Sequence, residues 1–162
     1  MKKFSWMIIL GTLLLFLGVF NHGVFKKEQL MDQGRLILME LAPVDPRSLI
    51  QGDYVRLEYA LGRSMAADSP SASGLAALEI DGMGVARSIR TIASLEELRI
   101  GELPIKYSKR SRRGIQIGAE SYFFQEGKAE KYEKAKYGGI KLDPKGNSLL
   151  IGLYDESFQK IE

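Results

Sequence analysis

Cysteine is absent from this 162-residue chain, and histidine occurs once. The missing thiols exclude disulfide frameworks, thiolate zinc sites, iron–sulfur clusters and cysteine nucleophiles. They leave the redox compartment open, because a lack of disulfides is compatible with either side of a membrane. The single histidine, His22, has no second imidazole with which to share a metal ion. We therefore expect it at a membrane–water interface and not in a metal site.

An excess of one sign of charge is also missing from most of the chain. The formal net charge is +3, from 23 basic and 20 acidic side chains. Four lysines flank the N-terminal apolar run, which leaves 19 basic against 20 acidic side chains in residues 28–162. A nucleic-acid-binding face needs a basic field, so we predict no nucleic-acid partner. The flanking residues are Lys2, Lys3, Lys26 and Lys27.

Sequence fingerprints for cofactors and metal ions are missing as well. There is no calcium-binding loop of regularly spaced aspartates, no Gly-rich phosphate loop and no dinucleotide-binding motif. Five carboxylates could converge as a hydrolytic pair or as ligands of a hard cation, but acids in hairpins are usually solvated. We therefore predict no cofactor and no metal. The five are Asp45, Asp53, Glu58, Glu120 and Glu126.

One long apolar run is present, at the N-terminus. From Phe4 to Phe25 the sequence has no charged side chain and is mainly Leu, Ile, Phe and Val. As a helix these 22 residues would span about 33 Å, against about 30 Å of membrane hydrocarbon. Trp6 and residues 21–23 suit the two interfaces. We expect residues 1–27 to form a single-pass anchor.

A cleavable signal peptide is the competing interpretation of this run. Its apolar region would be shorter, about 7 to 15 residues, and would end in a small-x-small cleavage site. Neither feature occurs here. Lys2, Lys3 and the terminal amine slightly outnumber Lys26 and Lys27, which favours a cytoplasmic N-terminus and a domain outside. The first expected partner is the lipid bilayer.

Residues 28–162 predict one β-rich extramembrane domain after a polar connector at 28–33. Period-two alternation and turn residues such as Asp81-Gly82 predict about eight short strands, and residues 127–137 predict one short helix ended by Gly138-Gly139. Residues 62–74 have the composition of a loop. We expect an antiparallel β-sandwich or partly open barrel. The strands are expected at residues 35–44, 54–61, 75–80, 85–92, 103–108, 114–124, 140–142 and 149–154.

A motif with defined spacing begins the second expected strand, at residues 52–59, GDYVRLEY. Glycine permits a tight turn, and the aspartate can accept backbone N–H bonds across it. In the strand that follows, Leu57 and Tyr59 share one face with Val55, while Arg56 and Glu58 point the other way. We favour a structural role for the motif, whose fixed positions are Gly52, Asp53, Tyr54, Leu57 and Tyr59.

The motif resembles the signature of the GDYXXLXY family, bacterial membrane-anchored proteins of unknown function. The resemblance extends upstream through residues 45–47 and downstream through 120–123 and 125–127, where Gln125 replaces an expected proline. It implies a single anchor, a β-rich domain and a multi-spanning membrane protein as partner. A candidate cleft would gather residues from both blocks: Asp45, Arg47, Asp53, Glu120 and Glu126.

A more distant likeness concerns residues 45–55, DPRSLIQGDYV, which are similar to a segment of type I signal peptidases. Those enzymes use a serine activated by a lysine base. Here the serine position falls at residues 42–44, which hold no hydroxyl, and Ser48 is the nearby alternative. The catalytic candidates are Ser48, Asp53 and Glu126.

Three functions remain open on the sequence, and a non-enzymatic one is favoured. In the preferred hypothesis the anchored β domain binds or helps assemble a multi-spanning membrane protein. A membrane-tethered hydrolase and an extracytoplasmic ligand-binding sensor are the alternatives. The basic residues 109–113 are expected at a solvated hairpin tip, which could touch anionic headgroups if it lies near the bilayer. The sequence does not decide the oligomeric state.

Overall fold

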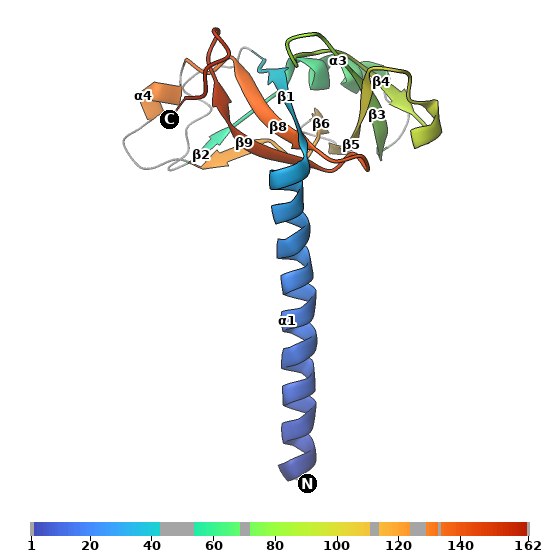
Figure 1. Ribbon diagram of the computed structural model, residues 1–162, viewed down its shortest axis with the longest axis vertical. Coiled ribbons are helices and arrows are strands. Elements are labelled where there is room, and N and C mark those ends of the chain that lie inside the picture. The colour runs from blue at the N-terminus through green and yellow to red at the C-terminus, as the bar shows by residue number, and fades with distance from the viewer. Residues whose placement is uncertain are drawn as a thin grey trace.

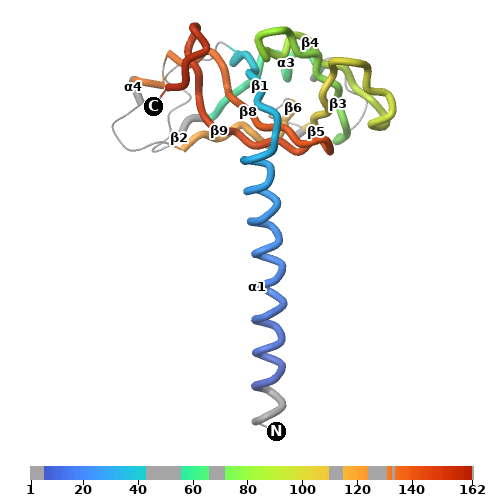
Figure 2. Tube along the Cα trace, in the orientation of Figure 1, coloured from blue at the N-terminus to red at the C-terminus, as the bar shows by residue number. Residues whose placement is uncertain are grey.

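A computed structural model of the chain describes residues 2–42, 54–68, 72–110, 114–123, 129–132 and 134–161. One long helix, α1 (Lys2–Gln33), stands away from a β-rich domain that lies across its C-terminal end (Figure 1). The trace in Figure 2 shows that none of the other described segments runs alongside this helix. The expected mainly β fold with one N-terminal helix is confirmed.

Helix α1 is long and apolar enough from Trp6 to Gln33 to cross a membrane, and it is not buried against the domain over its most apolar stretch. It does not end with the apolar run at Phe25. Residues 28–33, expected as a connector, form its last turns because Glu, Gln, Leu and Met favour helix and no Gly or Pro interrupts them. The helix ends at Gly34, whose N–H donates to the Leu30 carbonyl at 2.9 Å.

The first sheet continues directly from α1. It contains β1 (Arg35–Glu40), β8 (Tyr137–Leu142) and β9 (Ser148–Tyr154), in the antiparallel order β1-β8-β9. The β8–β9 turn is closed by the Asp143 carboxylate, which accepts the Lys145 and Asn147 N–H groups at 2.9 and 2.8 Å. The turn joins the two strands expected at residues 140–142 and 149–154.

The second sheet is four-stranded, in the order β4-β3-β5-β6. The expected β3–β4 hairpin is confirmed, and its Asp81 carboxylate accepts the Met83 and Val85 N–H groups, each at 2.9 Å. A 3-10 turn, η1 (Leu95–Glu97), follows this hairpin. The strands are β3 (Ser73–Ile80), β4 (Ala86–Ile92), β5 (Glu102–Arg110) and β6 (Gly114–Gln116).

A two-stranded ladder joins β2 (Tyr54–Arg56) to β7 (Ser121–Phe123). The expectation of one strand over residues 114–124 was therefore wrong. The chain breaks at Gly118, which has a φ of +84°, so that β6 pairs with β5 and β7 pairs with β2.

The helices inside the domain also differ from expectation. Residues 62–74 were expected to form a loop, but helix α3 covers Ala60–Asp68 and buries Met65 in the core. Helix α4 is confined to Ala129–Tyr132, and Gly138-Gly139 lie within β8 and do not end a helix. The glycines belong to the strand because the rings of Tyr59 and Tyr154 lie over them.

The core lies between the curved sheets. A parallel bridge pairs Leu38 of β1 with Val85, and the Lys106 N–H donates to the Gly146 carbonyl at 2.8 Å, so the two larger sheets are joined at two places. No buried side-chain nitrogen or oxygen in the described part of the chain lacks a hydrogen-bond partner. The largest fully buried side chains are Ile37, Met39, Leu78, Val85, Ile105, Ile140 and Leu153.

Candidate functional site

Tyr59, the last residue of the GDYxxLxY motif, is buried at the centre of the domain and is 5% exposed. Its hydroxyl donates to the Ala119 carbonyl at 2.5 Å, across 60 positions of sequence. Its ring lies against Gly138 of β8, where an added Cβ would be 2.9 Å from Cε1. The side chain thus connects three segments that are distant in sequence.

The backbone of the motif makes a second set of contacts with the same loop. The Leu57 N–H donates to the Glu120 carbonyl at 2.8 Å, which extends the β2–β7 ladder by one bond. On the other side of the motif, the backbone carbonyl of Glu58 accepts from the Ala42 N–H at 2.7 Å, and Tyr59 forms an antiparallel β-bridge with Leu41. Residues 54–59 therefore tie the β2–β7 ladder to the first sheet.

Glu120 fixes the shape of the loop that receives these bonds. Its carboxylate accepts the Ile117 N–H and, at 3.1 Å, the Gly118 N–H. The Ser148 hydroxyl donates to the Ile117 carbonyl and attaches the loop to β9. Because the carboxylate already receives two backbone donors, it acts here as a turn-closing group.

The protonation state of Tyr59 follows from its surroundings. Burial, and to a smaller degree the nearby Glu120 charge, hold the pKa of the Tyr59 hydroxyl well above its usual range. The hydroxyl therefore stays protonated at neutral pH and serves as a hydrogen-bond donor, not as a general base. A buried donor paired with a backbone carbonyl is a structural link.

The alternation expected along the motif is confirmed for the side chains that the structure describes. Leu57 and Tyr59 are buried, whereas Arg56 and Glu58 are exposed. Glu58 points away from the loop and forms an ion pair with Arg63 of α3 at 2.8 Å. Glu58 therefore does not join Glu120, although both were considered as candidate carboxylates.

Most of the candidate cleft lies outside the described residues, and its convergence stays a prediction. Glu120 is the one cleft member within them, and it meets the motif through Leu57 and Tyr59. Within β2, the Tyr54 backbone pairs with Phe123. Among the described residues, no three His, Asp or Glu side chains form a group that could hold a metal. The positions outside are Asp45, Arg47, Ser48, Gly52, Asp53 and Glu126.

Sequence reasoning missed the partners of Tyr59. Gly138 was assigned to a helix stop, and Ala119 attracted no attention because its side chain is not involved. The adjacent Gly138-Gly139 pair in an otherwise apolar strand was the available signal, since glycine inside a strand often marks a close approach by another group.

Comparison with known proteins adds one finding. Searches of curated proteins and of solved structures give no match to the chain. The family model described as GDYXXLXY protein matches residues 16–153, which include the end of the apolar helix, the motif and the Glu120 loop. The chain therefore belongs to the GDYXXLXY family.

Proposed function

We propose that α1 anchors this protein in a bacterial inner or cytoplasmic membrane, with the N-terminus in the cytoplasm and the domain outside. The anchored domain then binds or helps assemble a multi-spanning membrane protein. The observation that carries this proposal is the junction between helix and domain: a single residue, Gly34, separates α1 from β1.

This junction restricts what the domain can reach. Leu30, in the last turn of α1, is buried. A Cβ at Gly34 would collide with the Leu30 carbonyl and lie 3.1 Å from the Lys141 Cβ of β8. With no flexible tether, the domain moves as one unit with α1 and stays close to the membrane surface, so its partners are membrane proteins or lipids.

The buried motif supports a non-enzymatic role for this part of the domain. Leu57, Tyr59 and Glu120 use their polar groups to hold strands and a loop together. A tyrosine that is held protonated and donates to a backbone carbonyl, and a carboxylate that accepts two backbone N–H groups, both serve the packing of this part of the domain.

Membrane insertion and partner binding can be tested separately. Alkaline carbonate extraction of membranes should leave the full-length protein in the pellet, and a cysteine introduced at Ser157 should react with an impermeant thiol reagent outside the cell. The chain has no native cysteine to interfere. Release into the supernatant would contradict anchoring, and protection of position 157 from the reagent would indicate the opposite orientation.

Partner binding is tested by affinity purification of the detergent-solubilised full-length protein. A matched control replaces residues 4–25 with an unrelated apolar helix and keeps the domain. We expect a multi-spanning protein to co-purify with the native chain, and with the control only if the domain alone supplies the contact. Recovery of no membrane protein by either form would count against the proposal.

A further inference from the structure

The end of the domain that joins α1 is formed by segments distant in sequence. Because β8 runs antiparallel to β1, its last residue, Leu142, lies opposite Arg35, the first residue of β1. The turn after β8, residues 143–147, must therefore lie at the same end as the helix junction. Figure 1 shows this hairpin turn on the side of the domain from which α1 extends.

Basic side chains gather at this end, and we name them the basal surface. Arg35 and Lys145 are exposed, and Lys141 is partly exposed beside Gly34. The Lys106 ammonium donates to the Asn147 side chain at 2.8 Å, which places it beside the turn. The basal surface consists of Arg35, Lys106, Lys141 and Lys145, together with Lys26 and Lys27 on the helix below.

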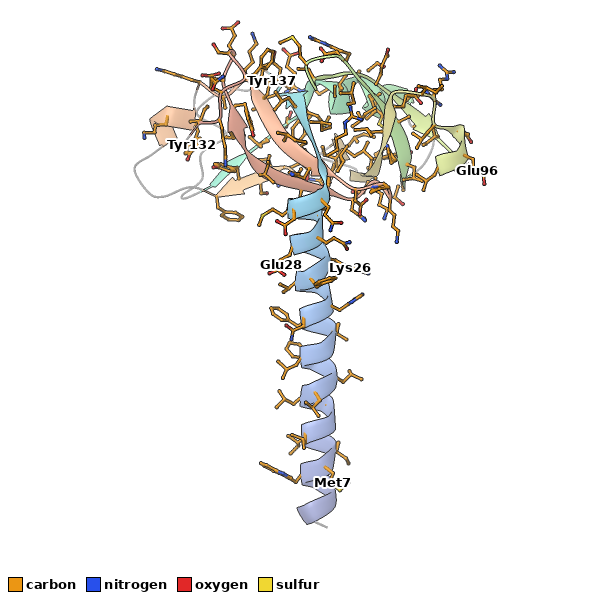
Figure 3. All side chains as sticks on the ribbon, viewed as in Figure 1. Met7, Lys26, Glu28, Glu96, Tyr132 and Tyr137 are labelled. Carbon is orange, nitrogen blue, oxygen red and sulfur yellow. The ribbon has the colours of Figure 1, made fainter. Side chains whose placement is uncertain are left out.

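Four acidic side chains are set against the six basic ones of the basal surface, and two of the four also accept backbone N–H groups while keeping their charge. Asp143 accepts the Lys145 and Asn147 N–H groups together with the Asn147 amide, and Glu120 accepts two N–H groups of its own loop. Glu28 and Asp32 lie on the helix, where Figure 3 shows Glu28 and Lys26 on opposite sides. Within the described residues, no ion pair engages Arg35, Lys141 or Lys145.

The helix places this surface close to the membrane. From Phe25, where the apolar run ends, to Gly34 the helix rises by about 13 Å. Transmembrane helices tilt on average by about 20°, which lowers one side of a broad domain towards the headgroups. The field of an anionic surface extends over a Debye length, about 8 Å at physiological salt. The headgroup layer itself extends about 5–7 Å beyond the hydrocarbon. Lys141, beside Gly34, and Lys145, in the turn, are therefore within range of this field.

We propose that the basal surface binds the anionic phosphates of lipid headgroups, and that this contact sets the direction in which α1 and the domain tilt relative to the membrane normal. The inference rests on the proposed insertion of α1 in a membrane. It adds a lipid-binding surface formed by the β8–β9 hairpin and the start of β1. By fixing the direction of tilt, lipid contact would decide which side of the domain faces a neighbouring membrane protein.

The test uses the full-length protein in nanodiscs. A fluorophore is attached to a cysteine at Pro144, in the turn, and in a second protein to a cysteine at Ser157. Residue 157 neighbours Phe158, whose ring contacts Tyr137 at 5.2 Å, on the side away from α1 in Figure 3. A lipid with a quencher on its headgroup reports how near each label comes. The nanodiscs contain phosphatidylcholine alone, or equal parts phosphatidylcholine and phosphatidylglycerol.

Quenching at position 144 should rise when phosphatidylglycerol is present and fall again at about 1 M salt, where the Debye length is about 3 Å. Position 157 should not respond. Each lysine near an anionic surface shifts the equilibrium towards the orientation with the basal surface at the headgroups by about five-fold. The double variant K141Q/K145Q should therefore lose most of the lipid response. The matched control, K134Q/K136Q, should keep it.

Two outcomes would overturn the inference: equal quenching at position 144 in both lipid mixtures, or an unchanged lipid response in K141Q/K145Q. Circular dichroism of each variant confirms that the domain is folded. Co-migration of the protein with nanodiscs measures insertion of α1 independently, so a failure of anchoring is distinguished from a failure of lipid binding.

Discussion

The ring of Tyr59 lies over Gly138 so closely that a Cβ on the glycine would be 2.9 Å from Cε1 and 3.0 Å from the hydroxyl oxygen. Gly138 belongs to β8 and Tyr59 ends the family motif, so the contact joins the motif to the first sheet. The same hydroxyl then reaches the Ala119 carbonyl. The absence of a side chain at residue 138 is thus a condition for the hydrogen bond at residue 119.

Gly138→Ala should therefore destabilise the domain. The new methyl group must displace a buried ring, and overpacking of this kind costs about 1–3 kcal/mol. Denaturant unfolding of the full-length protein in detergent measures the change. Gly82→Ala is the matched control, because an added Cβ there meets nothing within 4 Å. Equal stability of the two variants would contradict the close contact.

Tyr59→Phe should cost about 1–3 kcal/mol of unfolding free energy, because the Ala119 carbonyl would lose its buried donor. Tyr154→Phe is a suitable comparison, since that ring is only partly buried. If Tyr154→Phe lowered the unfolding free energy as much as Tyr59→Phe, the hydrogen bond to the Ala119 carbonyl would not be the cause of the destabilisation.

The raised pKa of Tyr59 also predicts a pH dependence. The folded domain holds the Tyr59 proton more tightly than the unfolded chain does. The contribution of Tyr59 to the free energy of unfolding is therefore complete below the ordinary tyrosine pKa of 10.0 and decreases as pH rises above it. Alkaline unfolding followed by fluorescence should show a steeper loss above that pH in the native protein than in Tyr59→Phe. Parallel curves would contradict this.

Acid sensitivity is expected from Glu102. Hydrogen bonds from Arg90 and from the Arg99 N–H lower the pKa of its carboxyl from 4.5 to about 2. Because the pKa is lowered, the contribution of Glu102 to the free energy of unfolding is present above pH 4.5 and is lost as pH falls towards 2. Glu102→Gln should flatten the stability profile in this range, whereas Glu96→Gln, at an exposed position of η1, should leave it unchanged.

The helix–domain junction gives a further prediction. Gly34→Ala should loosen the packing of Leu30 and expose the junction, because the new Cβ would collide with the Leu30 carbonyl. Limited proteolysis should then cut between α1 and β1 faster than in the native protein. Gly23→Ala, with open space around it, should not change the rate. An unchanged rate in Gly34→Ala would mean that the junction is more tolerant than its geometry indicates.

The sequence alone determined the features that depend on local chemistry. An uninterrupted apolar run makes a long helix, and Asp81 and Asp143 close their hairpins with bonds to residues two and four positions ahead. The inward placement of Leu57 and Tyr59 follows from strand alternation. These interactions involve near neighbours, so a pattern of residues is sufficient to predict them.

Only the tertiary structure decided the features that depend on distant partners. The break at Gly118 separates β6 from β7 because each pairs with a different strand, and α3 is stabilised by burial of Met65. Gly138 could be assigned to β8 only once the ring of Tyr59 was placed over it. Likewise, nothing in the spacing of Glu120 and Tyr59 indicated that Tyr59 contacts the loop that Glu120 closes. Non-local packing, which local patterns do not encode, brought them together.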